Sequence, residues 1–163
     1  MRIGFGSDIH RLAPGRRLVI GGVEISADFG SEGHSDGDTL SHAITDAILG
    51  ALAVGDIGQH FPDNDPKWKG ADSREFLRRA ADLVRQHSYS IVNVDSTVHL
   101  EGPKLRPYIE QIRTALAAEL GIELASISVK AKSGEGMDSV GEKRAIRAEA
   151  VVLLALSDRR QFG

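Results

Sequence analysis

The chain has 163 residues, no cysteine and a formal net charge of −3, with 41% hydrophobic and 26% charged residues. These values predict one folded domain, and they exclude disulfides, thiolate metal sites and cysteine nucleophiles. The charge balance gives no reason to expect a nucleic acid or membrane partner, and the apolar run 150–156 is too short to span a bilayer. Nothing at the start of the sequence is typical of a targeting peptide, so we expect a cytoplasmic protein.

The first ten residues alternate in character, which predicts a half-buried strand with a polar end. One side of this strand carries Ile3, Phe5 and Ile9, and the other carries Gly4, Gly6, Asp8 and His10. Residues 18–25 predict a small hairpin that turns at two glycines. Residues 29–37 are polar and glycine-rich and predict a loop.

Apolar residues at helical spacing predict a helix over 40–52, with Asp36 or Asp38 as its cap and Gly55 at its end. Residues 56–70 show no periodicity and predict a long loop, a kind of segment that is often functional. Asp72 and Glu75 resemble a capping box at the start of a second helix, whose core face is Phe76, Leu77, Ala80 and Val84.

The second half of the chain predicts a strand over 92–100, a helix over 107–120, a strand over 127–131 and a long strand over 144–156. This order predicts an α+β fold in a single domain, residues 1–156, with a mixed β-sheet that helices cover on one face. Residues 157–163 are expected to form a flexible C-terminal tail.

A candidate metal site emerges from three residues. Asp8 and His10 leave the same face of the first strand, and His42 lies on the polar side of the first helix. Without cysteine, zinc takes histidine nitrogens and a carboxylate, and Asp46, one turn after His42, could orient an imidazole or another polar group of the site. Asp-x-His is a common string, so a solvated pair and a surface histidine remain an open alternative.

Three further segments carry groups that suit an anionic ligand. His34 and Ser35 precede the N-terminus of the first helix, where a phosphate can bind, although a simply capped helix start explains them as well. Lys104 and Arg106 lie at a helix start, where positive side chains are unfavourable because they oppose the helix dipole. A bound anionic ligand would offset that cost and explain their presence. Glu135 follows two lysines and a serine after a strand, and a carboxylate beside phosphates suits a hard cation such as Mg²⁺. Solvated turns and loops are the alternatives for the last two segments.

Many short strings match one family in the expected order. They are Gly4-Phe5-Gly6-Ser7-Asp8-Ile9-His10, Gly21-Gly22-Val23, His34-Ser35-Asp36-Gly37-Asp38, Gly55-Asp56-Ile57-Gly58, Phe61-Pro62-Asp63, Lys69-Gly70-Ala71-Asp72-Ser73 and Pro103-Lys104. Over about residues 1–156 the chain resembles the 2-C-methyl-D-erythritol 2,4-cyclodiphosphate synthases of the non-mevalonate isoprenoid pathway. The resemblance implies a homotrimer with active sites between subunits. It also implies conversion of 4-diphosphocytidyl-2-C-methyl-D-erythritol 2-phosphate into the cyclic diphosphate and CMP, by metal-assisted attack of the 2-phosphate on the β-phosphate.

The resemblance also implies roles for single residues. Asp8, His10 and His42 would hold one zinc ion per subunit, and Glu135 a second divalent cation, Mg²⁺ or Mn²⁺. His34 and Ser133 would be catalytic and flank the transition state. The substrate-binding residues would be Asp8, His10, His34, Ser35, Asp46, Asp56, Ile57, Gly58, Phe61, Asp63, Asp65, Leu100, Pro103, Lys104, Leu105, Arg106, Ala131, Lys132, Ser133 and Glu135.

The sequence departs from the family pattern in two places. Lys132-Ser133-Gly134-Glu135 stands where many members have Thr-Thr-Thr-Glu, and Ser133 keeps the hydroxyl. Ser139 and Glu142 stand where many bacterial members carry Phe and Arg facing the trimer axis, so we expect no isoprenoid diphosphate to bind there. Two other functions stay open: a zinc phosphohydrolase that activates water at the same metal, and a non-catalytic nucleotide-binding trimer.

Overall fold

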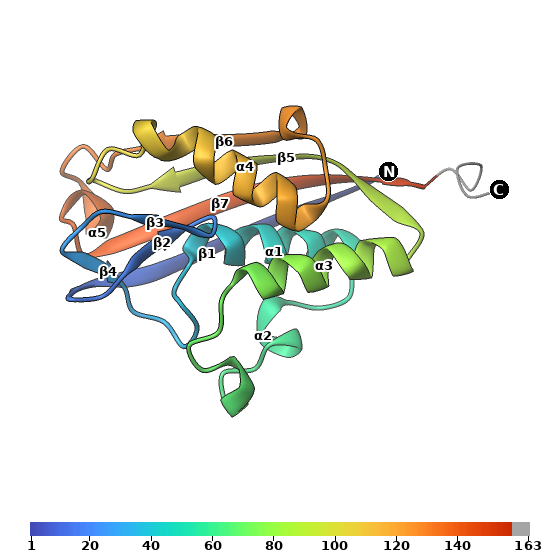
Figure 1. The fold of residues 1–163 in the computed structure, drawn as a ribbon, viewed down its shortest axis with the longest axis horizontal. Coiled ribbons are helices and arrows are strands. Elements are labelled where there is room, and N and C mark those ends of the chain that lie inside the picture. Colours follow the sequence, from blue (N-terminus) through green and yellow to red (C-terminus); the bar gives the residue numbers. More distant parts are fainter. Residues whose placement is uncertain (158–163) are drawn as a thin grey trace.

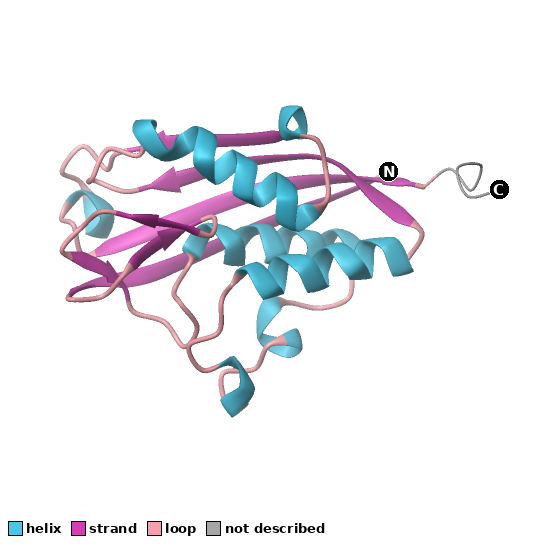
Figure 2. Ribbon diagram, viewed as in Figure 1, coloured by secondary structure: helices cyan, strands magenta, loops and turns pink. Residues whose placement is uncertain are grey.

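The structure is a computed structural model that describes residues 1–157, so residues 158–163 of the predicted tail lie outside it. A five-stranded mixed sheet forms one layer, and helices α1, α3 and α4 cover one of its faces (Figures 1 and 2). The strand order is β4-β1-β7-β5-β6, in which β5 and β6 are parallel and the other neighbours antiparallel. The predicted α+β class and mixed sheet are confirmed.

The elements follow the chain in the predicted order, with several short additions. The sheet strands are β1 (Arg2–Pro14), β4 (Phe29–Ser31), β5 (Tyr89–His99), β6 (Ile127–Lys132) and β7 (Ala145–Leu156), and the hairpin strands are β2 (Leu18–Ile20) and β3 (Val23–Ile25). The helices are α1 (Thr39–Leu52), α2 (Ile57–His60), α3 (Arg74–Gln86), α4 (Ile109–Leu120) and α5 (Asp138–Gly141), with 3-10 turns η1 (Pro66–Trp68), η2 (Arg106–Tyr108) and η3 (Leu124–Ser126).

Helix α1 lies directly on the glycine side of β1. A Cβ atom on Gly4 would come within 1.8 Å of the carbonyl oxygen of Ala47, and one on Gly6 within 2.2 Å of that of Ala43. Only glycine permits this approach, which places the start of α1 beside the polar end of β1. The helix is buried on nearly all sides between the sheet and α3, and its Leu40, Ile44 and Ile48 side chains are fully inaccessible.

The apolar side of β1 is the uncovered side. Ile3, Phe5 and Ile9 are 72%, 62% and 56% exposed, and they point away from the helices because their neighbours Gly4 and Gly6 face α1. The alternation predicted for this strand is therefore present, but in the single chain its large apolar residues face solvent. An apolar row of this kind on an open sheet face marks an interaction surface.

Asp38 caps α1 and also ties the hairpin to it. Its carboxylate accepts the Ser41 N–H at 3.0 Å, the Ser41 hydroxyl at 2.7 Å, and the N–H groups of Gly21 and Gly22 at 2.9 and 2.7 Å. Burial raises the pKa of this carboxyl and the nearby Asp36 raises it further, while the donors from Ser41 and Gly22 oppose the rise. The predicted cap is confirmed, and its four donors make Asp38 the link between β2–β3 and α1.

Three local predictions were wrong. Residues 29–31 form β4 because they pair with the end of β1, and the expected loop 56–70 contains α2 and η1, which Asp56 and Asp65 cap. The capping box at Asp72 does not form, because Asp72 pairs with Arg74 and Glu75 pairs with Arg79, and α3 begins after Ser73. The core face predicted for α3 is confirmed, since all four of its residues are buried.

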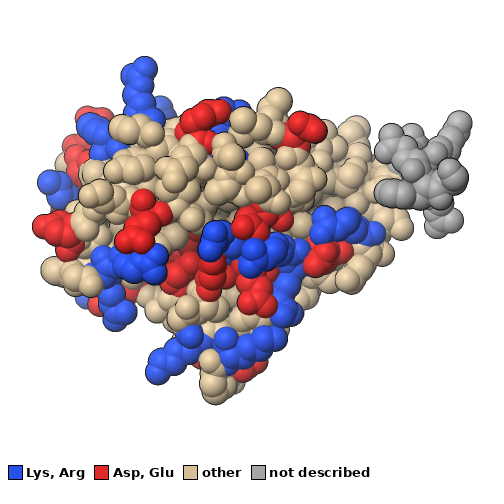
Figure 3. Space-filling model, viewed as in Figure 1, with Lys and Arg blue, Asp and Glu red and all other residues tan. Residues whose placement is uncertain are grey.

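On the helix-covered face, positive and negative side chains alternate (Figure 3). The four arginines of α3 each pair with a carboxylate: Arg74 with Asp72, Arg78 with Glu119, Arg79 with Glu75 and Arg85 with Asp82. The charges of this face are therefore balanced locally and do not gather into one basic surface. Within residues 1–157, no helix has the length and apolar character needed to cross a bilayer.

We expect Gly6→Ala to destabilise the fold by at least 1–3 kcal/mol, because the new methyl group must push α1 away from β1. Gly50→Ala is the matched control, since this exposed glycine of α1 has only the Phe5 carbonyl oxygen, at 3.9 Å, near the added Cβ. There the better helix former should stabilise the protein by about 0.5–1 kcal/mol. Urea unfolding measures both, and equal effects of the two variants would contradict the argument.

Candidate functional site

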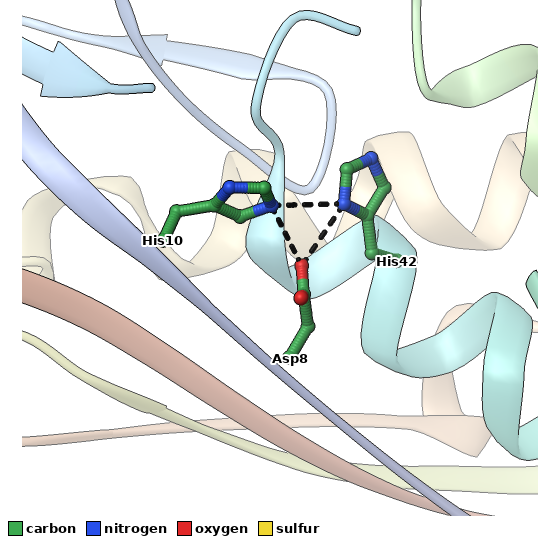
Figure 4. A group of neighbouring side chains, drawn as sticks. All are labelled: Asp8, His10 and His42. Atoms are coloured by element: carbon green, nitrogen blue, oxygen red, sulfur yellow. Dashed lines mark hydrogen bonds and ion pairs between the residues drawn. The ribbon is translucent and has the colours of Figure 1, made fainter. Parts of the chain in front are cut away.

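Three side chains converge where the polar end of β1 meets the start of α1 (Figure 4). Oδ2 of Asp8 lies 2.9 Å from Nε2 of His10 and 2.9 Å from Nδ1 of His42, and the two ring nitrogens are 3.2 Å apart. These three residues supply one ligand atom each within 4.8 Å of one another, which makes them a candidate metal site. The structure thus brings together the three residues that the sequence predicts as metal ligands.

The backbone around β1 fixes the ring of His10. Its Nδ1 lies 2.7 Å from the carbonyl oxygen of Glu32, which can only accept, so Nδ1 carries the proton and donates it. The lone pair of a neutral His10 is therefore on Nε2, which faces Asp8 and His42. A backbone carbonyl in this position is the usual partner of a histidine that binds a metal.

The electrostatics of the cluster favour a positive charge at its centre. Burial by itself raises the pKa of Asp8, but hydrogen bonds to His10 and His42 outweigh it and hold that pKa well below its ordinary value. Burial lowers the pKa of His10, but the hydrogen bond to Asp8, the negative charge of Asp8 and the hydrogen bond to the Glu32 carbonyl together outweigh it, and the net pKa is raised above 6.5. A carboxylate and two imidazole nitrogens this close repel one another unless a proton or a cation lies between them, so the donor set fits a divalent metal.

The cluster opens into a cavity of about 220 Å³. Its walls come from β1, the 34–35 segment, α1, α2, the η1 turn and α3, and an aromatic group of Phe61, Trp68 and Phe76 stacks next to the ring of His42. The lining residues are Asp8, His10, His34, Ser35, His42, Ile57, Gly58, Phe61, Asp63, Trp68 and Phe76. The cavity therefore combines ligating, polar and apolar walls, as a site for a polar small molecule requires.

A second cavity, of about 320 Å³, lies at the ends of β5 and β6. Its lining is Leu100, Pro103, Lys104, Leu105, Arg106, Ala131, Lys132, Ser133 and Glu135, the same nine residues of the 100–135 region for which the family resemblance implies substrate binding. The Ser133 hydroxyl donates to Oε1 of Glu135 at 2.6 Å, and Glu135 has a positive φ of 50°. A wider cavity of about 720 Å³ between α3, α4 and β5 contains no cluster of ligating groups among the described residues.

Strand register gives the separation of the two cavities. Asp8 pairs with Ala148, Ala148 with Val98, and Val98 with Ala131, so Asp8 and Ala131 lie on one rung of the sheet with two strands between them. Three interstrand spacings of about 4.8 Å place their backbones about 14 Å apart. The hairpin β2–β3 packs between α1 and α4, and among the described residues none lines both cavities.

Three predicted residues lie outside both cavity linings. Asp46 does not orient His42, because its Oδ1 accepts the N–H of Ile57 at 3.1 Å and so anchors α2. Asp56 and Asp65 use their carboxylates to cap α2 and η1. Sequence reasoning missed Trp68 and Phe76 as walls and Ser73 as a partner of His42, because only the fold brings their distant segments to the site.

The comparisons with known proteins agree with this geometry. The YgbB family matches residues 1–155. The 2-C-methyl-D-erythritol 2,4-cyclodiphosphate synthase of Solibacter usitatus (strain Ellin6076) is 54% identical over 154 residues, which cover 94% of this chain and 97% of the relative. The chain belongs to the YgbB family of 2-C-methyl-D-erythritol 2,4-cyclodiphosphate synthases.

Solved synthase structures share the fold. One with bound CDP superposes with a TM-score of 0.88 at 39% identity, covering 94% of this chain and 100% of that one. IspF of Plasmodium falciparum, in complex with CDP, superposes with a TM-score of 0.85 at 39% identity, covering 96% and 97%. The predictions of the family and of a synthase of isoprenoid biosynthesis are confirmed.

In metal-free protein, the Asp8–His10 pair should make stability depend on pH. The raised pKa of His10 adds stability that is present below pH 6.5 and is lost as the pH rises through that raised value. The lowered pKa of Asp8 adds stability that is present above pH 3.8 and is lost as the pH falls through the lowered value. The contribution of the pair is therefore largest between about pH 4 and 6.5.

Urea unfolding in the presence of a chelator checks this window. The difference in unfolding free energy between the wild type and Asp8→Asn should peak inside it and shrink toward pH 8. Asp28→Asn, at an exposed position, is the control and should show no such peak. A pH-independent difference for Asp8→Asn would contradict the coupling.

Proposed function

We propose that this synthase converts 4-diphosphocytidyl-2-C-methyl-D-erythritol 2-phosphate into 2-C-methyl-D-erythritol 2,4-cyclodiphosphate and CMP. The observation that carries the proposal is the convergence of Asp8, His10 and His42 at the wall of a polar cavity. An oxygen of the 2-phosphate forms a bond to the β-phosphorus, the bond from the β-phosphorus to the bridging oxygen breaks, and CMP leaves with the electron pair. The family membership of the chain supports this substrate and product.

The metal held by Asp8, His10 and His42 is zinc, one ion per subunit. Two imidazole nitrogens and one carboxylate form the ligand set of a catalytic zinc site, which leaves a fourth position for substrate. When bound there, zinc supplies a Lewis acid that polarises a phosphate oxygen and fixes its position. Asp8 and His10 also contact the substrate from this side of the cavity.

His34 and Ser35 bind the diphosphate, and His34 and Ser133 flank the transition state. Nε2 of His34 is buried without a hydrogen-bond partner among the described residues, and His34 lines the metal-site cavity. A buried polar atom without a partner is costly, and a phosphate oxygen would satisfy it. Positioned donors next to phosphorus stabilise the charge that develops there without reorganisation.

The two cavities divide the substrate between them. In the metal-site cavity, Ile57, Gly58, Phe61 and Asp63 contact the methylerythritol. Asp46 on α1 and the capping residues Asp56 and Asp65 bind it from the neighbouring positions. In the second cavity the CDP part lies against Leu100, Pro103, Lys104, Leu105, Arg106, Ala131 and Lys132. Glu135 there holds a second divalent cation, Mg²⁺ or Mn²⁺, which neutralises phosphate charge. The CDP named with two similar solved structures supports a cytidine site of this kind.

The chain works as a homotrimer with each active site between two subunits. Within one chain the two cavities are separate, with the hairpin packed between α1 and α4. A ring of subunits joined head to tail brings the metal-site cavity of one chain to the second cavity of the next. The exposed row of Ile3, Phe5, Ile9 and Val151 on the open sheet face supplies an apolar surface for such an assembly. A cytoplasmic location fits the absence of cysteine.

Incubation of the purified protein with the diphosphocytidyl substrate tests the reaction. We expect phosphorus NMR to show the cyclic diphosphate and CMP in equal amounts. Elemental analysis should find one zinc ion per chain. His42→Ala should lose most zinc and most activity, because two ligands hold zinc poorly. His87→Ala, at an exposed helix end, is the control and should keep both. Release of inorganic phosphate would favour a phosphohydrolase, and full zinc in His42→Ala would contradict the ligand assignment.

Mixing two inactive variants tests whether sites form between subunits. His42→Ala disables the metal-site cavity and Glu135→Gln the second cavity, so each homotrimer is inactive. In trimers reassembled from an equal mixture, half of the first cavities and half of the second are intact, which makes about one quarter of the sites complete. Recovered activity near that fraction would support the shared site. No recovery, with mixed trimers shown by native mass spectrometry, would place each site within one chain.

A further inference from the structure

Ser73 occupies the N-cap position of α3, but its side chain does not cap the helix. Its backbone is helical, with φ of −63° and ψ of −13°, and its hydroxyl makes no bond to the first turn. The residue is nevertheless fully buried. Serine at this position normally accepts an N–H of the helix. A residue that departs from its usual local role points to another function, and here the hydroxyl turns away from α3 toward the metal site.

The hydroxyl of Ser73 has its proton committed to Asp36. Both carboxylate oxygens of Asp36 already accept backbone N–H groups, from Ser73 at 3.0 Å and from Asp38 at 3.2 Å. Oδ1 of Asp36 also lies 2.5 Å from Oγ of Ser73. Because a carboxylate can only accept, Ser73 is the donor in that contact. The lone pairs of its oxygen are left for other partners.

Those lone pairs face His42. Oγ of Ser73 lies 2.9 Å from Nε2 of His42, in a contact buried from solvent. Since Ser73 has no second proton to give, Nε2 of His42 must be the donor. A neutral imidazole carries one N–H, so the lone pair of His42 is then on Nδ1, the atom that lies 2.9 Å from Asp8. The chain of donors from His42 through Ser73 to Asp36 therefore selects one tautomer.

Ser35 also contacts Nε2 of His42, at 3.0 Å, but it does not impose a direction. Within residues 1–157 the Ser35 hydroxyl has no carboxylate partner, and its contacts are with His42, with Ser73 at 3.3 Å and with the N–H of Gly37 at 3.4 Å. Its proton can therefore go either to Oγ of Ser73 or to a group in the cavity. The two serines that contact Nε2 of His42 thus have different roles: Ser73 fixes the ring, and Ser35 faces the cavity.

We propose that Ser73, held by Asp36, is a positioning residue that fixes His42 in the tautomer presenting Nδ1 to the metal. The inference rests on the zinc site of the proposed function. Ser73 would then do for His42 what the Glu32 carbonyl does for His10. Each is a fixed hydrogen-bond partner of the ring nitrogen that does not face the metal. Removal of such a partner typically weakens metal binding about 10- to 100-fold.

Zinc affinity, measured by competition with a chelator, tests the proposal. Ser73→Ala should bind zinc about 10- to 100-fold more weakly than the wild type. Ser73→Thr keeps the hydroxyl and should restore most of the affinity. Ser96→Ala is the matched control, because Ser96 is also a buried serine, on β5, whose hydroxyl donates to the Ser128 carbonyl at 2.9 Å and which does not line the metal-site cavity. It should bind zinc as the wild type does.

A spectroscopic measurement separates positioning from a general structural effect. In protein loaded with cobalt(II), the visible absorption band should change in Ser73→Ala and stay unchanged in Ser96→Ala, with thermal melting as the check on folding. If Ser73→Thr does not fold, Asp36→Asn provides the second test. It removes the carboxylate that holds Ser73, and it should weaken zinc binding as Ser73→Ala does. Wild-type affinity and an unchanged band in folded Ser73→Ala would overturn the proposal. Absence of zinc binding by the wild type would instead overturn the proposed function.

Discussion

The close approach of α1 to β1 is the constraint on which the site depends. At Gly4 and Gly6 the helix lies so close to the strand that no side chain fits between them. Asp8 and His10 follow on the same face of β1, beside the start of α1. His42 lies on the first turn of α1, so the distance between the two backbones sets the distance between the ligands. A larger residue at either glycine would push α1 away from β1 and so separate His42 from Asp8, without itself contacting the cavity.

Much of the fold could be predicted because local pattern and tertiary structure agree. The alternation of β1, the helical spacing of 40–52 and the long apolar strand at the end each follow the period of a single kind of element. The failures are short elements whose stability comes from distant partners. β4 exists because it pairs with the end of β1, and α2 is anchored by Asp46 from another helix. The secondary-structure propensities of those few residues do not predict such long-range contacts.

The candidate site shows the same division. Asp8 and His10 share a strand face, so their proximity follows from the period of the strand, whereas their meeting with His42 follows only from the packing of α1. Trp68, Phe76 and Ser73 were missed because they reach the site from η1 and from the start of α3, thirty or more positions after the 34–38 string. Asp46 has the spacing of an orienting carboxylate, but a nearby backbone N–H takes its oxygen, and spacing alone does not reveal that competition.

The hydrogen-bonded shell around His42 has a consequence for how the enzyme matures. Asp8 and His10 come from the first strand, His42 from the first helix and Ser73 from the start of α3, so the coordination sphere does not exist until these segments have packed. A metal ion held by Asp8, His10 and His42 would crosslink the N-terminal third of the chain, and it would bind only after these segments had packed. Its binding free energy would then add to the stability of the native state, and a cell short of the ion would hold a less durable protein.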